Sequence, residues 1–204
     1  MPLVQKHAEG SFCWIELETT DQNAANRFYN GLFGWTAKDF PMGPGEVYTM
    51  FQMEGRDAAA TYTLRPDIKG VPPHWNLYVA VENADTVAAR AIAAGAKLLA
   101  APFDVYDLGR MAVIQDPTGA VLSIWQAKSN IGVGIAGVPG TLCWADLSTA
   151  DPARAGAFYA ELFQWHLELS ENDSFGYLHI LNQGEYIGGV PPVKHRSPNT
   201  PPDW

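Results

Sequence analysis

The chain has 204 residues and a formal net charge of −9 at pH 7, with 47% hydrophobic and 17% charged residues, which indicates one large or two small globular domains. Aromatic residues make up 12% of the chain, enough apolar surface to build a core and line a pocket, and this excludes a disordered chain or a coiled coil. The 13 basic residues are scattered among 22 acidic ones, so nucleic acid is not an expected partner.

No apolar run approaches the roughly 18 residues that a bilayer span needs, and residues 1–10 hold no signal-type hydrophobic segment. We therefore expect no membrane partner and a cytoplasmic location. The two cysteines, Cys13 and Cys143, are too few for a disulfide framework and lie in apolar runs, where buried thiols are common. We expect both to be reduced and structural.

The first predicted element is a strand at 12–18, where side chains alternate with a period of two. A helix follows, capped by Thr20 or Asp21, with apolar residues at three- and four-residue spacing and Gly34 at its end. Within it, Phe28 and Tyr29 are expected to pack in the core. Gly/Pro-rich turns then separate three shorter predicted strands, at 36–40, 47–53 and 58–64. The order is β-α-β-β-β.

The same order restarts after residues 65–73. It comprises a strand at 75–81, an Ala-rich helix at 84–94 and strands at 97–101, 110–115 and 121–126. The sequence Asp116-Pro-Thr-Gly119 predicts a tight turn between the last two strands. Residues 128–140 form a Gly-rich connector, and a third β-α-β-β-β unit begins at Leu142, with Asp151 as helix cap and Pro152 in the first turn.

The chain contains an internal repeat, because Cys13-Trp14 recurs as Cys143-Trp144, 130 positions later. Further identities at this offset pair Leu17, Thr19, Asp21, Ala25, Phe28, Tyr29, Leu32, Phe33 and Trp35 with Leu147, Thr149, Asp151, Ala155, Phe158, Tyr159, Leu162, Phe163 and Trp165. After a one-residue gap, Pro72-Pro73 and Trp75 match Pro201-Pro202 and Trp204. The second copy stops at Trp204, so we expect it to be incomplete, in a fragment or a truncated gene product.

These motifs resemble the vicinal oxygen chelate superfamily of glyoxalases, extradiol dioxygenases and bleomycin resistance proteins, and in particular the two-domain glyoxalase-like proteins of actinobacteria. The resemblance is carried by Thr19-Thr20-Asp21, Phe28-Tyr29, 32–35 and 116–119. It implies an α+β fold in which two βαβββ units form a cupped mixed sheet with helices outside. It also implies a complete domain at 10–127, a linker at 128–140 and the first half of a second domain at 141–204.

Enzymes of that superfamily bind a divalent metal through His and Glu side chains on the first strand of each unit and on the last strand. In this chain the corresponding positions are Trp14, Asn76 and Ser123, which are poor metal ligands. The resemblance therefore implies a cup without a metal cofactor. The alternative is that Glu16 and His74, which share strand faces with Trp14 and Asn76, help to bind a divalent ion such as Zn²⁺, Ni²⁺ or Mn²⁺.

We expect the cup to bind a small, partly apolar molecule, with aromatic burial supplying affinity and a few polar groups setting orientation. The candidate ligand-binding residues are Trp14, Glu16, Asn76, Tyr78, Ser123 and Trp125. For the tryptophans the alternative is core packing, and for Glu16 it is an exposed position at the mouth of the cup. Catalytic residues are not identified.

Two other functions remain open. In the first, the protein is a metal-dependent lyase or isomerase of the glyoxalase type, in which Glu16 or His74 serves as ligand or base. In the second, the half-domain is an interaction module whose sheet face meets the same face of another chain in a homodimer.

Overall fold

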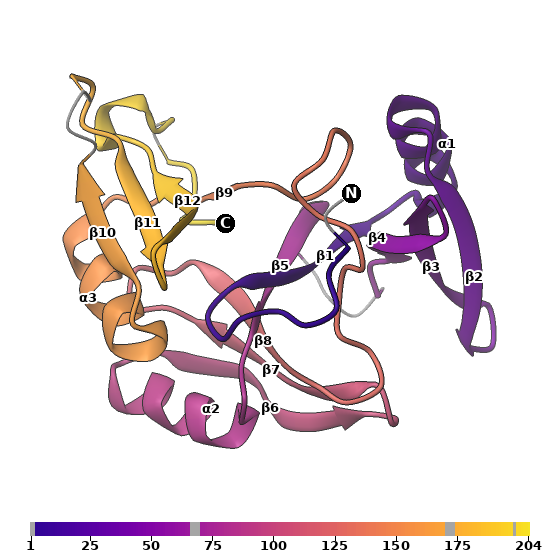
Figure 1. The fold of residues 1–204 in the computed structure, drawn as a ribbon, viewed down its shortest axis with the longest axis horizontal. Helices are drawn as coiled ribbons and strands as arrows, with labels where there is room; N and C mark the ends of the chain where they lie inside the picture. Colours follow the sequence, from indigo (N-terminus) through magenta and orange to yellow (C-terminus); the bar gives the residue numbers. More distant parts are fainter. Residues whose placement is uncertain (1–2, 66–69, 170–173, 198) are drawn as a thin grey trace. The chain divides into compact units, whose positions relative to one another are not determined.

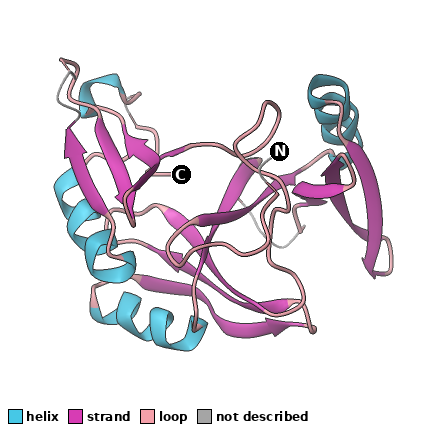
Figure 2. Ribbon diagram, in the orientation of Figure 1, coloured by secondary structure: helices cyan, strands magenta, loops and turns pink. Residues whose placement is uncertain are grey.

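The computed structural model describes residues 3–65, 70–169, 174–197 and 199–204 (Figure 1). Two compact units are present. The first comprises Met1–Lys6, Trp14–Leu77 and Gly132–Cys143, and the second comprises His7–Cys13, Tyr78–Ile131 and Trp144–Trp204. Helices and strands occur in both (Figure 2), which confirms the predicted α+β class. The division into domains at 10–127, 128–140 and 141–204 remains a prediction.

The first unit contains one βαβββ module. Its elements are β1 Phe12–Thr19, whose first two residues belong to the second unit, α1 Gln22–Phe33, β2 Thr36–Gly43, β3 Glu46–Met53 and β4 Arg56–Thr63. The strand order is β2-β3-β4-β1, with β1 parallel to β4 and the other neighbours antiparallel. The sequence predicted all five elements, with β2 three residues longer than expected.

Helix α1 begins and ends where its capping residues predict. The carboxylate of Asp21 accepts a hydrogen bond from the backbone N–H of Ala24 at 2.9 Å, and Gly34, at φ 69°, donates its N–H to Asn30. The ring of Tyr29 packs against Trp35, Phe51 and other aromatic rings, as expected. The prediction for Phe28 is wrong: its side chain is 60% exposed.

The geometry of the helix permits this exposure but does not explain it. Successive residues of an α-helix point about 100° apart, so the side chain before inward-facing Tyr29 can point away from the sheet. Phe158, which matches Phe28 at an offset of 130 positions, is 3% exposed, so the surroundings of the two rings and not their helical position decide their burial.

The second unit contains the next module. Its elements are the end of β5 His74–Ala80, α2 Ala84–Ala93, β6 Lys97–Val105, β7 Gly109–Gln115 and β8 Val121–Ala127. The strand order is β5-β8-β7-β6, with β5 parallel to β8. The predicted turn at Asp116 is formed by its Oδ1, which accepts hydrogen bonds from the backbone N–H groups of Thr118, Gly119 and Ala120 at 2.7–3.0 Å.

The third module also belongs to the second unit. It consists of β9 Ala145–Asp146, α3 Pro152–Phe163, β10 His166–Leu169, β11 Leu178–Asn182, β12 Glu185–Val190 and the 3₁₀ turn η1 Val193–His195, with strand order β10-β11-β12-β9. Asp151 caps α3 as predicted, and α3 lies beside α2 (Figure 1). The first strand is shorter than expected, because only Ala145 and Asp146 pair with β12, and neither Leu142 nor Cys143 is part of it.

Exposure of the two thiols differs. Cys13 is buried, and burial raises the pKa of its thiol, in agreement with a structural role. Cys143 is exposed and lies before β9, outside any strand. Its expected burial is therefore wrong. No helix in the described part of the chain combines the length and the apolar character that membrane crossing requires.

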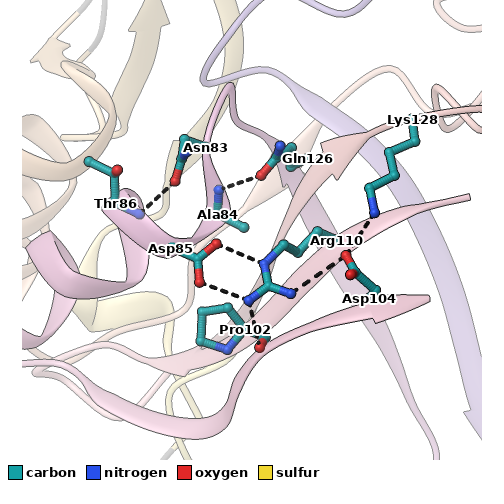
Figure 3. Close-up of polar contacts among 9 residues, drawn as sticks. All are labelled: Asn83, Ala84, Asp85, Thr86, Pro102, Asp104, Arg110, Gln126 and Lys128. Carbon is teal, nitrogen blue, oxygen red and sulfur yellow. Dashed lines mark hydrogen bonds and ion pairs between the residues drawn. The ribbon is translucent and has the colours of Figure 1, made fainter. Parts of the chain in front are cut away.

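An ion-pair cluster fastens α2 to the sheet of the second unit (Figure 3). The Arg110 guanidinium donates two hydrogen bonds to Asp85 at 2.7 and 2.8 Å and a third to the carbonyl of Pro102 at 3.1 Å. Asp104 lies 3.5 Å from Arg110 and 2.8 Å from Lys128. Each charged group in the cluster has an opposite partner, so the cluster is structural.

Candidate functional site

One face of β1 presents Trp14, Glu16 and Glu18, because alternate residues of a strand point to the same side. The indole N–H of Trp14 donates a hydrogen bond to the hydroxyl oxygen of Tyr48 at 3.0 Å, and that hydroxyl donates to Oε2 of Glu16 at 2.8 Å. Trp14 and Glu16 are only 6% and 5% exposed. We name Trp14, Tyr48 and Glu16 the first triad.

The strand order explains how Tyr48 reaches Glu16. Tyr48 lies on β3, Glu16 lies on β1, and β4 runs between them. The residue of β4 opposite Glu16 is Ala60. Because the alanine side chain ends at Cβ, it leaves space above β4 in which the phenol and the carboxylate meet.

Two phenols interact with the Glu16 carboxylate, Tyr48 through a hydrogen bond and Tyr62 through its electrostatic field. Burial raises the pKa of Tyr48 well above its ordinary value, and the charge of Glu16 raises it further. Tyr62 lies opposite Tyr48 in the sheet, with ring centroids 6.0 Å apart, and burial and then Glu16 raise its pKa as well. Both phenols therefore keep their protons at neutral pH, and the site combines neutral donors with one buried carboxylate.

His74, a candidate base or metal ligand in the alternative hypothesis, interacts elsewhere. Its Nε2 lies 3.8 Å from Oε1 of Glu18, and its Nδ1 lies 2.9 Å from the carbonyl of Pro72. Asn76, two residues along the same strand, is buried at 8% exposure. The first unit thus contains three of the six predicted site residues, Trp14, Glu16 and Asn76, and connects the first two through Tyr48.

The other three predicted residues, Tyr78, Ser123 and Trp125, lie on one sheet face of the second unit. Tyr78 is opposite Ser123 in the parallel pair of β5 and β8, and its ring makes an edge contact with Trp125 at 6.3 Å. All three are buried. The Trp125 indole donates to the carbonyl of Asn130 at 2.9 Å and lies over Gly109, where any Cβ would overlap the ring. Trp125 therefore has a packing role whether or not it contacts a ligand.

Sequence reasoning missed Tyr48 and Tyr62. Tyr48 lies in the predicted strand at 47–53 and Tyr62 in the one at 58–64, and the period of two shows which neighbours share a face. Their meeting with Glu16, however, depends on the register of three strands, which includes a shift between Phe51 and Gln52. A tyrosine that alternates with apolar residues is the available signal, and it does not identify its partner.

Comparison with known proteins identifies the family to which this fold belongs. The model of the Glyoxalase/Bleomycin resistance protein/Dioxygenase superfamily matches residues 11–124. A Mycobacterium tuberculosis protein named "Putative glyoxylase CFP32" is 37% identical over 212 residues, covering 100% of this chain and 78% of that protein. The chain belongs to the glyoxalase/bleomycin resistance protein/dioxygenase superfamily.

Other relatives of this superfamily member differ in their described roles. "Anthracycline biosynthesis protein DauV" from Streptomyces sp. (strain C5) is 37% identical over 166 residues, covering 76% of this chain and 60% of that protein. Among solved structures, a 4-hydroxymandelate synthase mutant from Streptomyces coelicolor has a TM-score of 0.67 at 16% identity, covering 95% of this chain and 66% of that one. A Mn(II)-bound glyoxalase from Novosphingobium aromaticivorans has a TM-score of 0.66 at 14% identity, covering 90% and 62%. These two structures show the shared fold.

The donor set of this superfamily member does not fit a divalent metal. The expected ligand positions hold Trp14, Asn76 and Ser123, and the indole of Trp14 is engaged by Tyr48. Within residues 3–65, 70–169, 174–197 and 199–204, no group of three or more His, Cys, Asp or Glu side chains is arranged to hold an ion. A catalytic metal needs about three protein ligands, so no chemical step is assigned to one here.

Proposed function

We propose that this superfamily member is a glyoxalase-like protein that binds a small, partly apolar molecule. The first triad carries the proposal, because it places a buried carboxylate among aromatic side chains. Burying a charge is costly unless hydrogen bonds compensate, and Tyr48 supplies such a bond. The proposed ligand-binding residues are Trp14, Glu16 and Asn76 in the first unit, to which we add Tyr48, and Tyr78, Ser123 and Trp125 in the second unit.

The chemistry of these residues limits the ligand. Indole and phenol rings offer flat apolar surface, which supplies affinity for a planar or cyclic molecule. The carboxylate of Glu16 accepts hydrogen bonds, so it favours a ligand with a hydroxyl or another donor. The names of the relatives support a small organic molecule as the ligand class, since they refer to glyoxylases and to anthracycline biosynthesis.

A thermal-shift screen of small hydroxylated aromatic and carbonyl compounds, followed by titration calorimetry of each hit, tests the proposal. Glu16→Gln and Trp14→Phe should each weaken a hit about tenfold, a loss of about 1.4 kcal/mol. The matched control is Glu46→Gln, which removes the same charge at an exposed position of β3 and should leave affinity unchanged. Equal affinity in all three variants would contradict the proposal.

Metal analysis separates the proposal from a glyoxalase-type lyase or isomerase. Protein purified without a metal-affinity step is measured by elemental mass spectrometry, before and after incubation with Zn²⁺, Ni²⁺ and Mn²⁺. A near-stoichiometric divalent ion would favour the metal-dependent enzyme, and Glu16 and His74 would then be tested as ligands.

A further inference from the structure

The third module contains a second copy of the triad. The indole N–H of Trp144 donates to the hydroxyl of Tyr177 at 2.7 Å and to Oδ1 of Asp146 at 2.9 Å. The hydroxyl of Tyr177 in turn donates a hydrogen bond to the same Oδ1. Trp144 and Asp146 follow Trp14 and Glu16 by 130 positions. The repeat thus preserves a Trp–Tyr–carboxylate arrangement, which we name the second triad.

Two size changes compensate for each other in the second triad. Asp146 is one methylene shorter than Glu16, and the residue opposite it on the neighbouring parallel strand is Gly189 in place of Ala60. A Cβ at Gly189 would overlap the hydroxyl of Tyr177. The missing methyl group leaves room for the phenol beside the backbone of β12, where its hydroxyl reaches the shorter acid.

The second triad is far more exposed than the first. Trp144 is 39% exposed, against 6% for Trp14, and the neighbouring Tyr186 is 49% exposed. The imidazole of His179 lies among these rings, with centroids 4.9 Å from Tyr177, 5.1 Å from Tyr186 and 6.0 Å from Trp144. Accessible aromatic rings and a carboxylate therefore share one face of the third module.

The charge of this face is negative. The second-triad hydrogen bonds of Asp146 are made by Oδ1, and Asp146 has no ion pair among the described residues. Burial and the hydrogen bond to Asp146 raise the pKa of Tyr177 to about 12, so the phenol is neutral at pH 7. Glu168, opposite His179 on β10, accepts a hydrogen bond from Tyr186 at 2.7 Å and lies 3.6 Å from His166.

We infer that this face of the third module binds an organic ammonium ion carried on an apolar or aromatic frame. The ammonium group would donate to the carboxylate of Asp146, and the rings of Trp144 and Tyr186 would attract it through their negative π faces. An anionic ligand would be repelled by Asp146 and Glu168. The inference rests on residues of the second unit alone, so its failure would leave the proposed function of the first triad unchanged.

Titration calorimetry of the full chain at pH 7 with three matched probes tests the inference. The probes are phenethylamine, the neutral phenethyl alcohol and the anion phenylacetate, which share one aromatic frame. The amine should bind, the alcohol should bind at least about tenfold more weakly, and phenylacetate should show no measurable heat. Equal binding of amine and alcohol would overturn the inference.

Variants then locate the site. Asp146→Asn should reduce the affinity for phenethylamine about tenfold, whereas Glu161→Gln, with the same charge change on an exposed position of α3, should have no effect. If Asp146→Asn fails to fold, NMR of the unaltered protein replaces it: phenethylamine must shift the indole N–H signal of Trp144, assigned with Trp144→Phe. An unshifted Trp144 signal would refute the site.

Light scattering tests whether a second copy of the chain covers this face. A monomer whose light scattering is unchanged by Trp144→Ala supports an accessible small-molecule site. A dimer that Trp144→Ala dissociates would show that the face is an interface between copies, and the ammonium site would be withdrawn.

Discussion

Trp35 and Trp165 occupy equivalent positions in the two repeats, and each anchors the segment that precedes the other repeat. Within the first unit, the indole N–H of Trp35 donates to the carbonyl of Gly140 at 2.8 Å. Within the second unit, Trp165 donates to the carbonyl of Gly10 at the same distance. Both glycines have positive φ, 82° and 80°, a conformation that glycine adopts without strain. Two indoles that are 130 positions apart thus make the same hydrogen bond to two glycines that are also 130 positions apart.

Removing one of these bonds should loosen only its own segment. Trp165→Phe keeps an aromatic ring in the core but leaves the Gly10 carbonyl without its donor, and we expect a loss of about 1–3 kcal/mol in the free energy of unfolding. Urea unfolding measures the loss. Hydrogen exchange of the Gly10 amide, which bonds to the carbonyl of Ala80, should accelerate before global unfolding. Unchanged Gly10 exchange would contradict the anchoring role.

Asp116 connects the second and third modules within the second unit. Its Oδ1 holds the turn after β7, and its Oδ2 accepts a hydrogen bond from the hydroxyl of Tyr159 at 2.9 Å. Asp116→Ala leaves several buried donors unsatisfied, and we expect a loss of about 3–5 kcal/mol, read from the midpoint of chemical unfolding. Asp107→Ala, at an exposed position, is the control and should change stability by less than about 0.5 kcal/mol.

The sequence predicted most elements because the spacing of apolar residues within a single strand or helix is enough to indicate its type. The capping residues Asp21 and Asp151 and the turn at Asp116 were predictable for the same reason, since their hydrogen bonds reach only a few residues along the chain. The triads were not predictable, because Tyr48 meets Glu16 only after three strands have aligned. The short β9 was missed because whether Leu142 pairs depends on the neighbouring strand, not on its own apolar character.

The acid sensitivity of the Arg110 cluster follows from its ion pairs. The hydrogen bonds of Arg110 lower the pKa of Asp85, and the ammonium of Lys128 lowers that of Asp104, below the ordinary value of 3.8. Their contribution to stability is thus present above pH 3.8 and is lost as the pH falls further, when the carboxylates are protonated. Arg110→Met should reduce the difference in thermal stability between pH 7 and pH 3. Because both carboxylates are exposed, added salt should weaken the effect.

The phenol of Tyr177 should lose its proton only at high pH. Burial and then the hydrogen bond to Asp146 raise its pKa to about 12 from an ordinary value of 10.0, so the folded state holds this proton more tightly than the unfolded state. The resulting stabilisation is complete below pH 10 and is lost as the pH rises toward 12. The difference between the ultraviolet titration curves of the protein and of Tyr177→Phe measures this group. Asp146→Asn should move its midpoint downward, and an unmoved midpoint would exclude the hydrogen bond as a cause.

Gly189→Ala should break the second triad without changing any of its members. The added Cβ would overlap the hydroxyl of Tyr177, so the phenol must move away from β12 and release Asp146. Gly189 does not have a positive φ, so backbone strain plays no part, and we expect a steric cost of about 1–3 kcal/mol in unfolding free energy.

A double variant separates this steric effect from general damage. Combining Gly189→Ala with Tyr177→Ala removes the whole phenol that the added Cβ would overlap, so the double variant should lose less unfolding free energy than the sum of the two single losses. Additive losses would show that the alanine disturbs the strand itself, and the size compensation between Asp146 and Gly189 would then not explain how the repeat keeps its triad.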